Sequence, residues 1–274
     1  GAYFAPTVSV ASSSQNILAS IKPLELIVRT LNKPLLEQNV GFEVSTLLPP
    51  GATPHDYVLK PSDIVRVLNA DLVIWMGAAV EPYLVSVIAK ADQDKVVDIS
   101  QLGGLKRLPF RALLENGNGH DNEMHNDHHD DHEMLQFDPH LWWSVDNAEI
   151  IMMQVLAILD VTGNDKKVLV KQVMSPIRAM LSSKKALAMK LKPSFILFHD
   201  GLQYLECDLA VESAARVALD DDHRPGIKTL LALKQKVKVN QVACVVAETN
   251  TNVSVIHKIE AATPLRQVVI DSLG

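Results

Sequence analysis

The sequence predicts an α/β protein of two lobes, each with a parallel-type sheet covered by helices, joined by one long backbone helix. Three observations lead to this fold class. Strand-like apolar runs alternate with helical stretches in both halves of the 274-residue chain, an order typical of parallel sheets. Between the halves lies a helical pattern of about 28 residues, which would span roughly 42 Å. Hydrophobic residues make up 47% of the chain, enough to bury a core.

In the first lobe, residues 1–163, strands and helices alternate up to a histidine-rich stretch. Short apolar runs beside turn residues predict strands at 8–13, 42–50, 71–77 and 95–100. Helical spacing of apolar residues predicts helices at 16–31, 61–70, 81–91 and 144–159.

The linking helix is expected at 164–192, because Asn164 is a good N-cap and Pro193 stops the pattern. Pro176 lies inside it and should kink or interrupt it, since an interior proline costs about 3 kcal/mol. The alternation resumes in the second lobe, residues 193–274. Strands are expected there at 194–200, 241–248 and 266–274, a strand with a turn at 209–217, and helices at 201–208, 226–239 and 253–262.

Composition excludes several classes of function. The net charge of −6 is matched by the six acidic residues of segment 117–134, which has no Lys or Arg, so nothing indicates a nucleic-acid partner. No apolar run approaches the roughly 18 residues of a membrane span, and no HExxH, GxSxG, P-loop or GxGxxG motif is present. Cys207 and Cys244 could form one disulfide or be two small buried hydrophobes, and we favour the second.

The stretch "HDNEMHNDHHDDHEM" lies in a segment, 115–136, whose composition predicts an acidic surface loop. It contains five histidines: His120, His125, His128, His129 and His132. We expect weak, exchangeable capture of zinc, copper or nickel, because a flexible loop loses conformational entropy when it is ordered around an ion. A merely solvated loop is the alternative.

Isolated histidines occupy more informative places. His199 ends the apolar run "FILFHDG", at the carboxyl end of an expected strand, where open α/β sheets bind ligands. His55 lies in the Gly/Pro-rich loop "PPGATPHDY", His140 lies between aromatics in "FDPHLWW", and Asp271 ends the apolar run "VVID". Each could by itself be an ordinary core, turn or loop residue. Together, three imidazoles and one carboxylate could form a closed tetrahedral zinc shell between the lobes.

Three further residues of the second lobe are of a type that can bind or support a metal. Glu248 ends the strand "VVAE" and could accept a hydrogen bond that orients a ligand histidine. His257 is expected on the solvated side of a helix, and His223 in an acidic surface turn.

Four segments, "GATPHDYVLKPSD", "FDPHLWWS", "FILFHDGLQYL" and "VIDSLG", together resemble the ZnuA-type zinc receptors of bacterial ABC importers. The resemblance implies two lobes bridged by a rigid helix, with the metal buried between them. It also implies the ligands His55, His140 and His199, with Asp271 or water in the fourth place. Some relatives carry a glutamate beside the first histidine, but here Pro54 stands there.

The chain departs from this family pattern at its end. Relatives continue past the last strand into a closing helix, often with a cysteine that pairs with one at the position of Cys244. This sequence stops at Gly274, so we expect a truncated chain or a further tail, with less support for the strand that carries Asp271.

The expected function is high-affinity capture of Zn²⁺ in the interlobe cleft and its delivery to the membrane permease of an ABC importer. Three nitrogen donors and one oxygen suit zinc better than manganese. We expect a periplasmic monomer whose signal peptide has been removed, with the histidine-rich loop as an accessory collector or sensor. The start Gly-Ala-Tyr favours a protein without a lipid anchor. A zinc hydrolase is the alternative, because three histidines with an open fourth position also describe a catalytic zinc.

Overall fold

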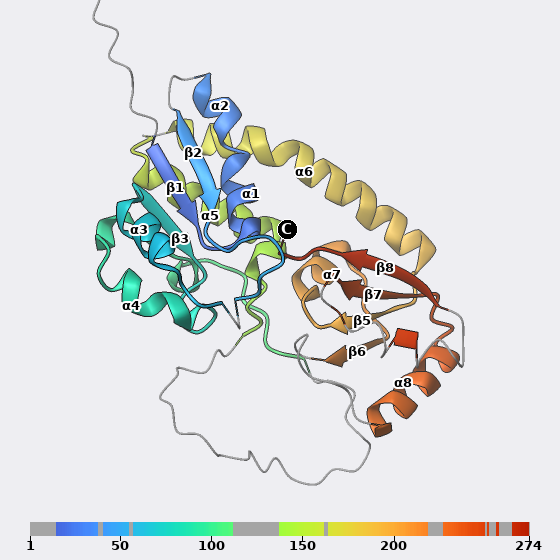
Figure 1. Cartoon of the computed structure of the whole chain (residues 1–274). Helices are drawn as coiled ribbons and strands as arrows, with labels where there is room; N and C mark the ends of the chain where they lie inside the picture. Colours follow the sequence, from blue (N-terminus) through green and yellow to red (C-terminus); the bar gives the residue numbers. More distant parts are fainter. Residues whose placement is uncertain are drawn as a thin grey trace, which may run out of the picture.

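The computed structural model describes residues 15–37, 41–54, 57–111, 137–161, 164–218, 227–249, 251, 256–257 and 265–273. Figure 1 shows two α/β lobes side by side, with the long helix α6 (Asn164–Leu191) running from one to the other. Each lobe contains a four-stranded sheet in which all pairings are parallel, so the expected fold class is confirmed. None of the described helices is both long and apolar enough to cross a membrane.

The first sheet has the order β2–β1–β3–β4, and helices cover both of its faces. Its strands are β1 (Gln15–Ala19), β2 (Phe42–Thr46), β3 (Leu72–Trp75) and β4 (Val96–Asp98). Alternate strand residues point to opposite faces. Ile17 and Ile74 pack with α1 (Lys22–Arg29) and α5 (Val145–Ile158), whereas Leu18 and Val73 pack with α3 (Pro61–Asn69) and α4 (Val85–Ile88). The short helix α2 (Asn32–Leu36) follows α1.

The expectation of one helix over residues 16–31 is wrong at its start. Residues 15–19 form strand β1, which pairs with β2 on one side and with β3 on the other. Ile17 and Leu18 are both buried, on opposite faces, and a strand between two helix layers satisfies this pattern. Pro23 then occupies the first turn of α1. The strand expected at 8–13 lies outside the described residues.

The second sheet has the order β6–β5–β7–β8. Its strands are β5 (Phe195–His199), β6 (Ala215–Ala218), β7 (Cys244–Glu248) and β8 (Arg266–Ile270). Ile196, Phe198 and Val245 form its core with Leu233 and Val237 of α8 (Ile227–Val239). Residues of the expected helix 253–262 lie mostly outside the described residues, although Ile256 and His257 are helical.

Helix α6 continues through Pro176 without a break, so of the two expected effects, a kink or an interruption, the interruption does not occur. Pro176 and Gln172 are both exposed, and the carbonyl of Gln172, which loses its helical partner, can bond to water instead. The first half of α6 packs into the first lobe through Leu169, Val170 and Met174.

Helix α7 (Gln203–Leu209) connects the lobes, because it follows β5 but packs against the first lobe. Tyr204 is fully buried within the first-lobe core. Its hydroxyl donates to the carbonyl of Asp138 at 2.8 Å and accepts from the backbone N–H of Leu108 at 3.0 Å. Asp208 accepts from the backbone N–H of Val145, at the start of α5, at 3.0 Å. These contacts hold the two lobes together along α7.

Both cysteines carry free thiols. Cys244 in β7 is partly buried, and burial raises the pKa of its thiol. Cys207 is exposed, so the expectation that both cysteines are buried is wrong for this residue. The inward positions of α7 belong to Tyr204 and Glu206, and the Cys207 sulfur instead lies 3.0 Å from Nζ of Lys106.

Candidate metal centre

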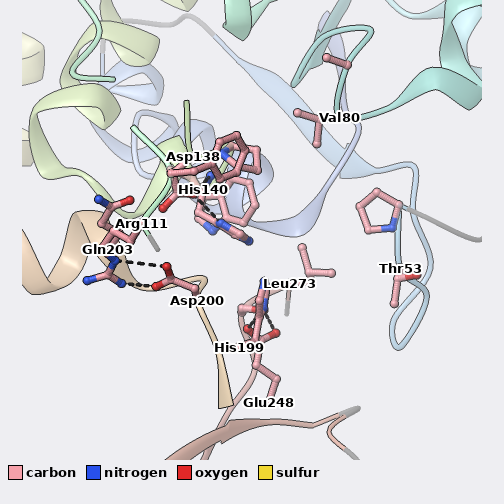
Figure 2. Close-up of a pocket in the computed structure, with 16 residues that line it drawn as sticks. Thr53, Val80, Arg111, Asp138, His140, His199, Asp200, Gln203, Glu248 and Leu273 are labelled. Atoms are coloured by element: carbon pink, nitrogen blue, oxygen red, sulfur yellow. Dashed lines mark hydrogen bonds and ion pairs between the residues drawn. The ribbon is translucent and has the colours of Figure 1, made fainter. Parts of the chain in front are cut away.

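A cavity of about 270 Å³ lies between the lobes, at the carboxyl ends of β5 and β7. Both lobes contribute to its walls (Figure 2). The described residues that line it are Thr53, Pro54, Ala79, Val80, Phe110, Arg111, Asp138, Pro139, His140, Trp142, His199, Asp200, Gln203, Glu248, Ser272 and Leu273. The lining combines apolar side chains with a group of ionisable ones, a mixture typical of ligand sites.

His199 enters the cavity as the last residue of β5. Its Nδ1 lies 2.8 Å from Oε1 of Glu248, the last residue of the neighbouring strand β7. A carboxylate at this position accepts the Nδ1–H, which places the free lone pair on Nε2. The structure therefore places Glu248 beside one of the three histidines that the sequence suggested as metal ligands.

Glu248 is set up to remain ionised. Burial raises the pKa of Glu248. The hydrogen bond and charge of His199, the Ser272 hydroxyl and the nearby His140 lower it by more than burial raises it, so that this pKa lies below its ordinary value. The Ser272 hydroxyl donates to Oε2 of Glu248. Both carboxylate oxygens are thus engaged, which fixes the rotamer that supports His199.

His140 comes from the other lobe, just before the short 3₁₀ helix Leu141–Trp143. Its Nδ1 lies 2.7 Å from Oδ1 of Asp138, and the same oxygen accepts from the His140 backbone N–H at 2.9 Å. Asp138 is buried, with 3% of its surface exposed. Our sequence interpretation did not single out Asp138, although its place two residues before His140 is a local signal for this pairing.

The two imidazoles meet across the lobes. Their ring centroids are 4.9 Å apart and their planes are inclined by 69°. Figure 2 shows His140 and His199 facing one another, each with its own carboxylate behind it. Because both Nδ1 atoms contact carboxylates, each ring is held in the tautomer that carries its lone pair on Nε2, and neutral imidazole is a preferred donor for zinc.

The structure does not place the other two predicted ligands, His55 and Asp271, among the described residues that line the cavity. His55 lies outside the described residues, but Thr53 and Pro54 line the cavity. The side chain of Asp271 is exposed, and its Oδ1 accepts from the backbone N–H of Leu273 at 3.2 Å. Asp271 is not among the described lining residues, whereas the two residues that follow it are. Its part in a metal shell stays a prediction.

Within the described residues, no cluster of three or more metal-binding side chains occurs. A complete shell around the His140–His199 pair therefore needs a donor from elsewhere in the chain or from solvent. The loop histidines and His223 lie outside the described residues, and His257 is exposed, as expected.

Comparisons with known proteins agree on one family. The family model described as "Zinc-uptake complex component A periplasmic" matches residues 17–274. The chain is 27% identical to the high-affinity zinc uptake system protein ZnuA of Yersinia pestis, over 96% of this chain and 84% of that protein. It is 29% identical to the ZnuA of Haemophilus ducreyi, over 96% of this chain and 86% of that protein.

Solved structures support the fold. A crystal structure of ZnuA aligns with a TM-score of 0.74 at 20% identity, covering 95% of this chain and 92% of that chain. A zinc-bound ZnuA deletion mutant aligns with a TM-score of 0.73 at 19% identity, covering 95% and 91%. At these identities the likeness concerns the arrangement of the two lobes.

Proposed function

We propose, from the premise that the chain belongs to the ZnuA family of periplasmic zinc-uptake components, that it captures Zn²⁺ in the cavity between its lobes. The family match covers residues 17–274, nearly the whole chain. Members of this family are solute receptors for zinc transport and not enzymes, so the alternative of a zinc hydrolase is set aside.

The observation that carries the proposal is the pair of imidazoles supplied by different lobes. A metal ion bound by both His140 and His199 would bridge the lobes, so capture and lobe position are linked. Carboxylates behind the two rings fix their tautomers and orientations. Donors that are already oriented lose little entropy on binding, which favours high affinity.

The ligand set that we propose is His55, His140 and His199, with Asp271 or water as the fourth ligand. The donors that the structure describes, two imidazoles supported by carboxylates, fit zinc. Copper and nickel also bind imidazole, so discrimination against them would depend on the geometry of the whole shell.

We also propose that the loaded receptor delivers zinc to the membrane permease of an ABC importer in the periplasm, and that it acts as a monomer. Family membership supports this kind of partner and this compartment. The histidines of segment 115–136 would collect zinc more weakly, a proposal supported by their composition alone.

A competitive zinc titration of the intact chain against a chelator of known affinity tests the proposal. We expect His140→Ala and His199→Ala each to weaken zinc binding by at least about 100-fold, because each removes a ligand. His257→Ala is the matched control, since this exposed histidine lies outside the cavity, and it should leave the tight site unchanged.

A chain that lacks residues 117–134 separates the cavity from the loop. The tight site should survive this deletion. Tight binding that disappears with the segment, or that persists in both cavity variants, would show that the cavity is not the zinc site.

A further inference from the structure

Arg111 joins the two lobes beside the cavity, and it belongs neither to the proposed ligands nor to the carboxylates that orient them. Its guanidinium donates from Nε to Oδ2 of Asp200 at 3.2 Å, and from Nη2 to Oδ1 of the same carboxylate. Nη2 also forms an ion pair with Oε2 of Glu206 at 2.6 Å. The three side chains are 17%, 7% and 5% exposed, so solvent screens this cluster little. Figure 2 shows Arg111 facing Asp200.

The partners of Arg111 lie at the end of β5 and in α7. Asp200 directly follows His199 in the chain. Glu206 lies in α7, and its Oε1 accepts from the backbone N–H of Ser213, ahead of β6, at 2.6 Å. One first-lobe guanidinium therefore holds the chain on both sides of the turn that follows His199.

The spacing between His140 and His199 depends on contacts that join the two lobes, because each lobe supplies one of the rings. Glu248 fixes the rotation of the His199 ring but belongs to the same lobe as that ring, so it cannot set the distance to His140. A guanidinium that engages a carboxylate through two N–H groups fixes direction as well as distance. Arg111 makes such a contact across the lobes, at the residue next to His199.

We propose that Arg111 is a positioning residue that holds His199 at binding distance from His140 and thereby slows the release of zinc. This inference rests on the proposed function of the cavity. Changes in affinity among variants of one binding site appear mostly in the dissociation rate, so the release of zinc is the quantity that should respond.

Loss of the positive charge of Arg111 would change the rate of zinc release in the opposite direction to loss of its positioning contact. Arg111, Asp200 and Glu206 together carry one net negative charge, and removal of the guanidinium leaves two. A more negative cavity wall attracts a cation more strongly, so an effect of charge alone would slow zinc release in Arg111→Gln. The sign of the change therefore separates positioning from electrostatics.

Lys106 offers a matched control. Its Nζ lies 3.2 Å from Oδ1 of Asp208, so it joins the same first-lobe segment to the same helix α7. Asp208, however, lies further along the chain from His199 than Asp200 and Glu206 do, near the end of α7, and it is also held by the backbone N–H of Val145. Lys106→Gln removes a cation from the contact between the lobes without releasing the end of β5.

The experiment loads the intact chain and each variant with one equivalent of zinc and measures release into excess chelator by stopped flow. We expect Arg111→Gln to accelerate release by about tenfold or more, because small displacements of a binding group cost large factors. Arg111→Lys, which keeps the charge but not the fork, should recover part of the loss. Lys106→Gln should stay within about twofold, as partly exposed ion pairs do.

Thermal melting of the zinc-free proteins identifies variants that fail to fold. The double variant Arg111→Gln/Asp200→Asn also removes one of the two buried carboxylates that would lose their cation, the one next to His199, and it should still release zinc quickly. Unchanged or slower release in Arg111→Gln, or equal acceleration in Lys106→Gln, would overturn the inference. An unmutated chain that retains no zinc would instead overturn the proposed function, and the inference with it.

Discussion

The two histidines of the cavity have the same kind of support, but the chain builds it in two different ways. His140 and its carboxylate Asp138 are two residues apart, in one loop before a 3₁₀ turn. His199 and Glu248 are 49 residues apart and meet because β5 and β7 are neighbours in the second sheet. One pair is local, and the other depends on the strand order of a whole lobe.

The difference affects how firmly each ring is held. Asp138 uses one oxygen for both the ring and the backbone of His140, and its second oxygen is buried with no hydrogen-bond partner among the residues that the structure describes. Glu248 uses one oxygen for His199 and the other for Ser272. The pair that depends on strand order is therefore the more fully bonded. We infer that His199 is the more rigid donor.

The largest effects on zinc binding are expected when each of the two carboxylates is removed in turn. We expect Glu248→Ala to weaken zinc binding by about 100-fold and Asp138→Ala by about tenfold, within the range found for groups that orient metal ligands. The chelator titration used for the histidine variants measures both. Equal losses in the two variants would show that the second oxygen of Glu248 adds nothing to the support of His199.

Glu81 is a buried carboxylate that supports neither of the two cavity histidines, and it contrasts with Asp138 and Glu248. Glu81 is fully buried, and burial raises its pKa to about 7, although the backbone N–H of Met76 and the Tyr83 hydroxyl donate to it. The unfolded chain releases this proton near pH 4.5, so Glu81 lowers stability progressively as pH rises from about 4.5 to about 7 and no further above that.

Glu81→Gln should therefore match the stability of the parent at pH 4 and exceed it by on the order of 3 kcal/mol at pH 8. Urea unfolding of the zinc-free proteins at the two pH values measures the difference. A variant that is less stable than the parent at pH 8 would mean that the ionised carboxylate stabilises the fold.

The smallest expected effect concerns Ser272. Ser272→Ala removes the hydroxyl that donates to Glu248 but leaves the bond between Glu248 and His199. Zinc affinity should fall about threefold, which corresponds to one hydrogen bond of roughly 0.7 kcal/mol. The same titration measures it, with His257→Ala again as the control. A loss as large as that of Glu248→Ala would place the orienting role on Ser272.

Several features followed from the sequence by itself. The alternation of apolar strands and helices predicted two parallel sheets and the long α6, because side-chain periodicity is a local property of the backbone. The same reasoning put His199 and Glu248 at the carboxyl ends of strands, where the structure has them. The close spacing of Asp138 and His140 was also readable, since two residues in one turn can reach each other without any tertiary contact.

Tertiary structure decided the rest. Local pattern could not show that residues 16–19 form a central strand, because burial on two faces depends on the helices that pack there. Nor could it show that β7 lies beside β5, that Tyr204 joins the core of the first lobe, or that Arg111 reaches Asp200. These contacts join residues far apart in the chain, and which of them form is decided by the packing of whole layers.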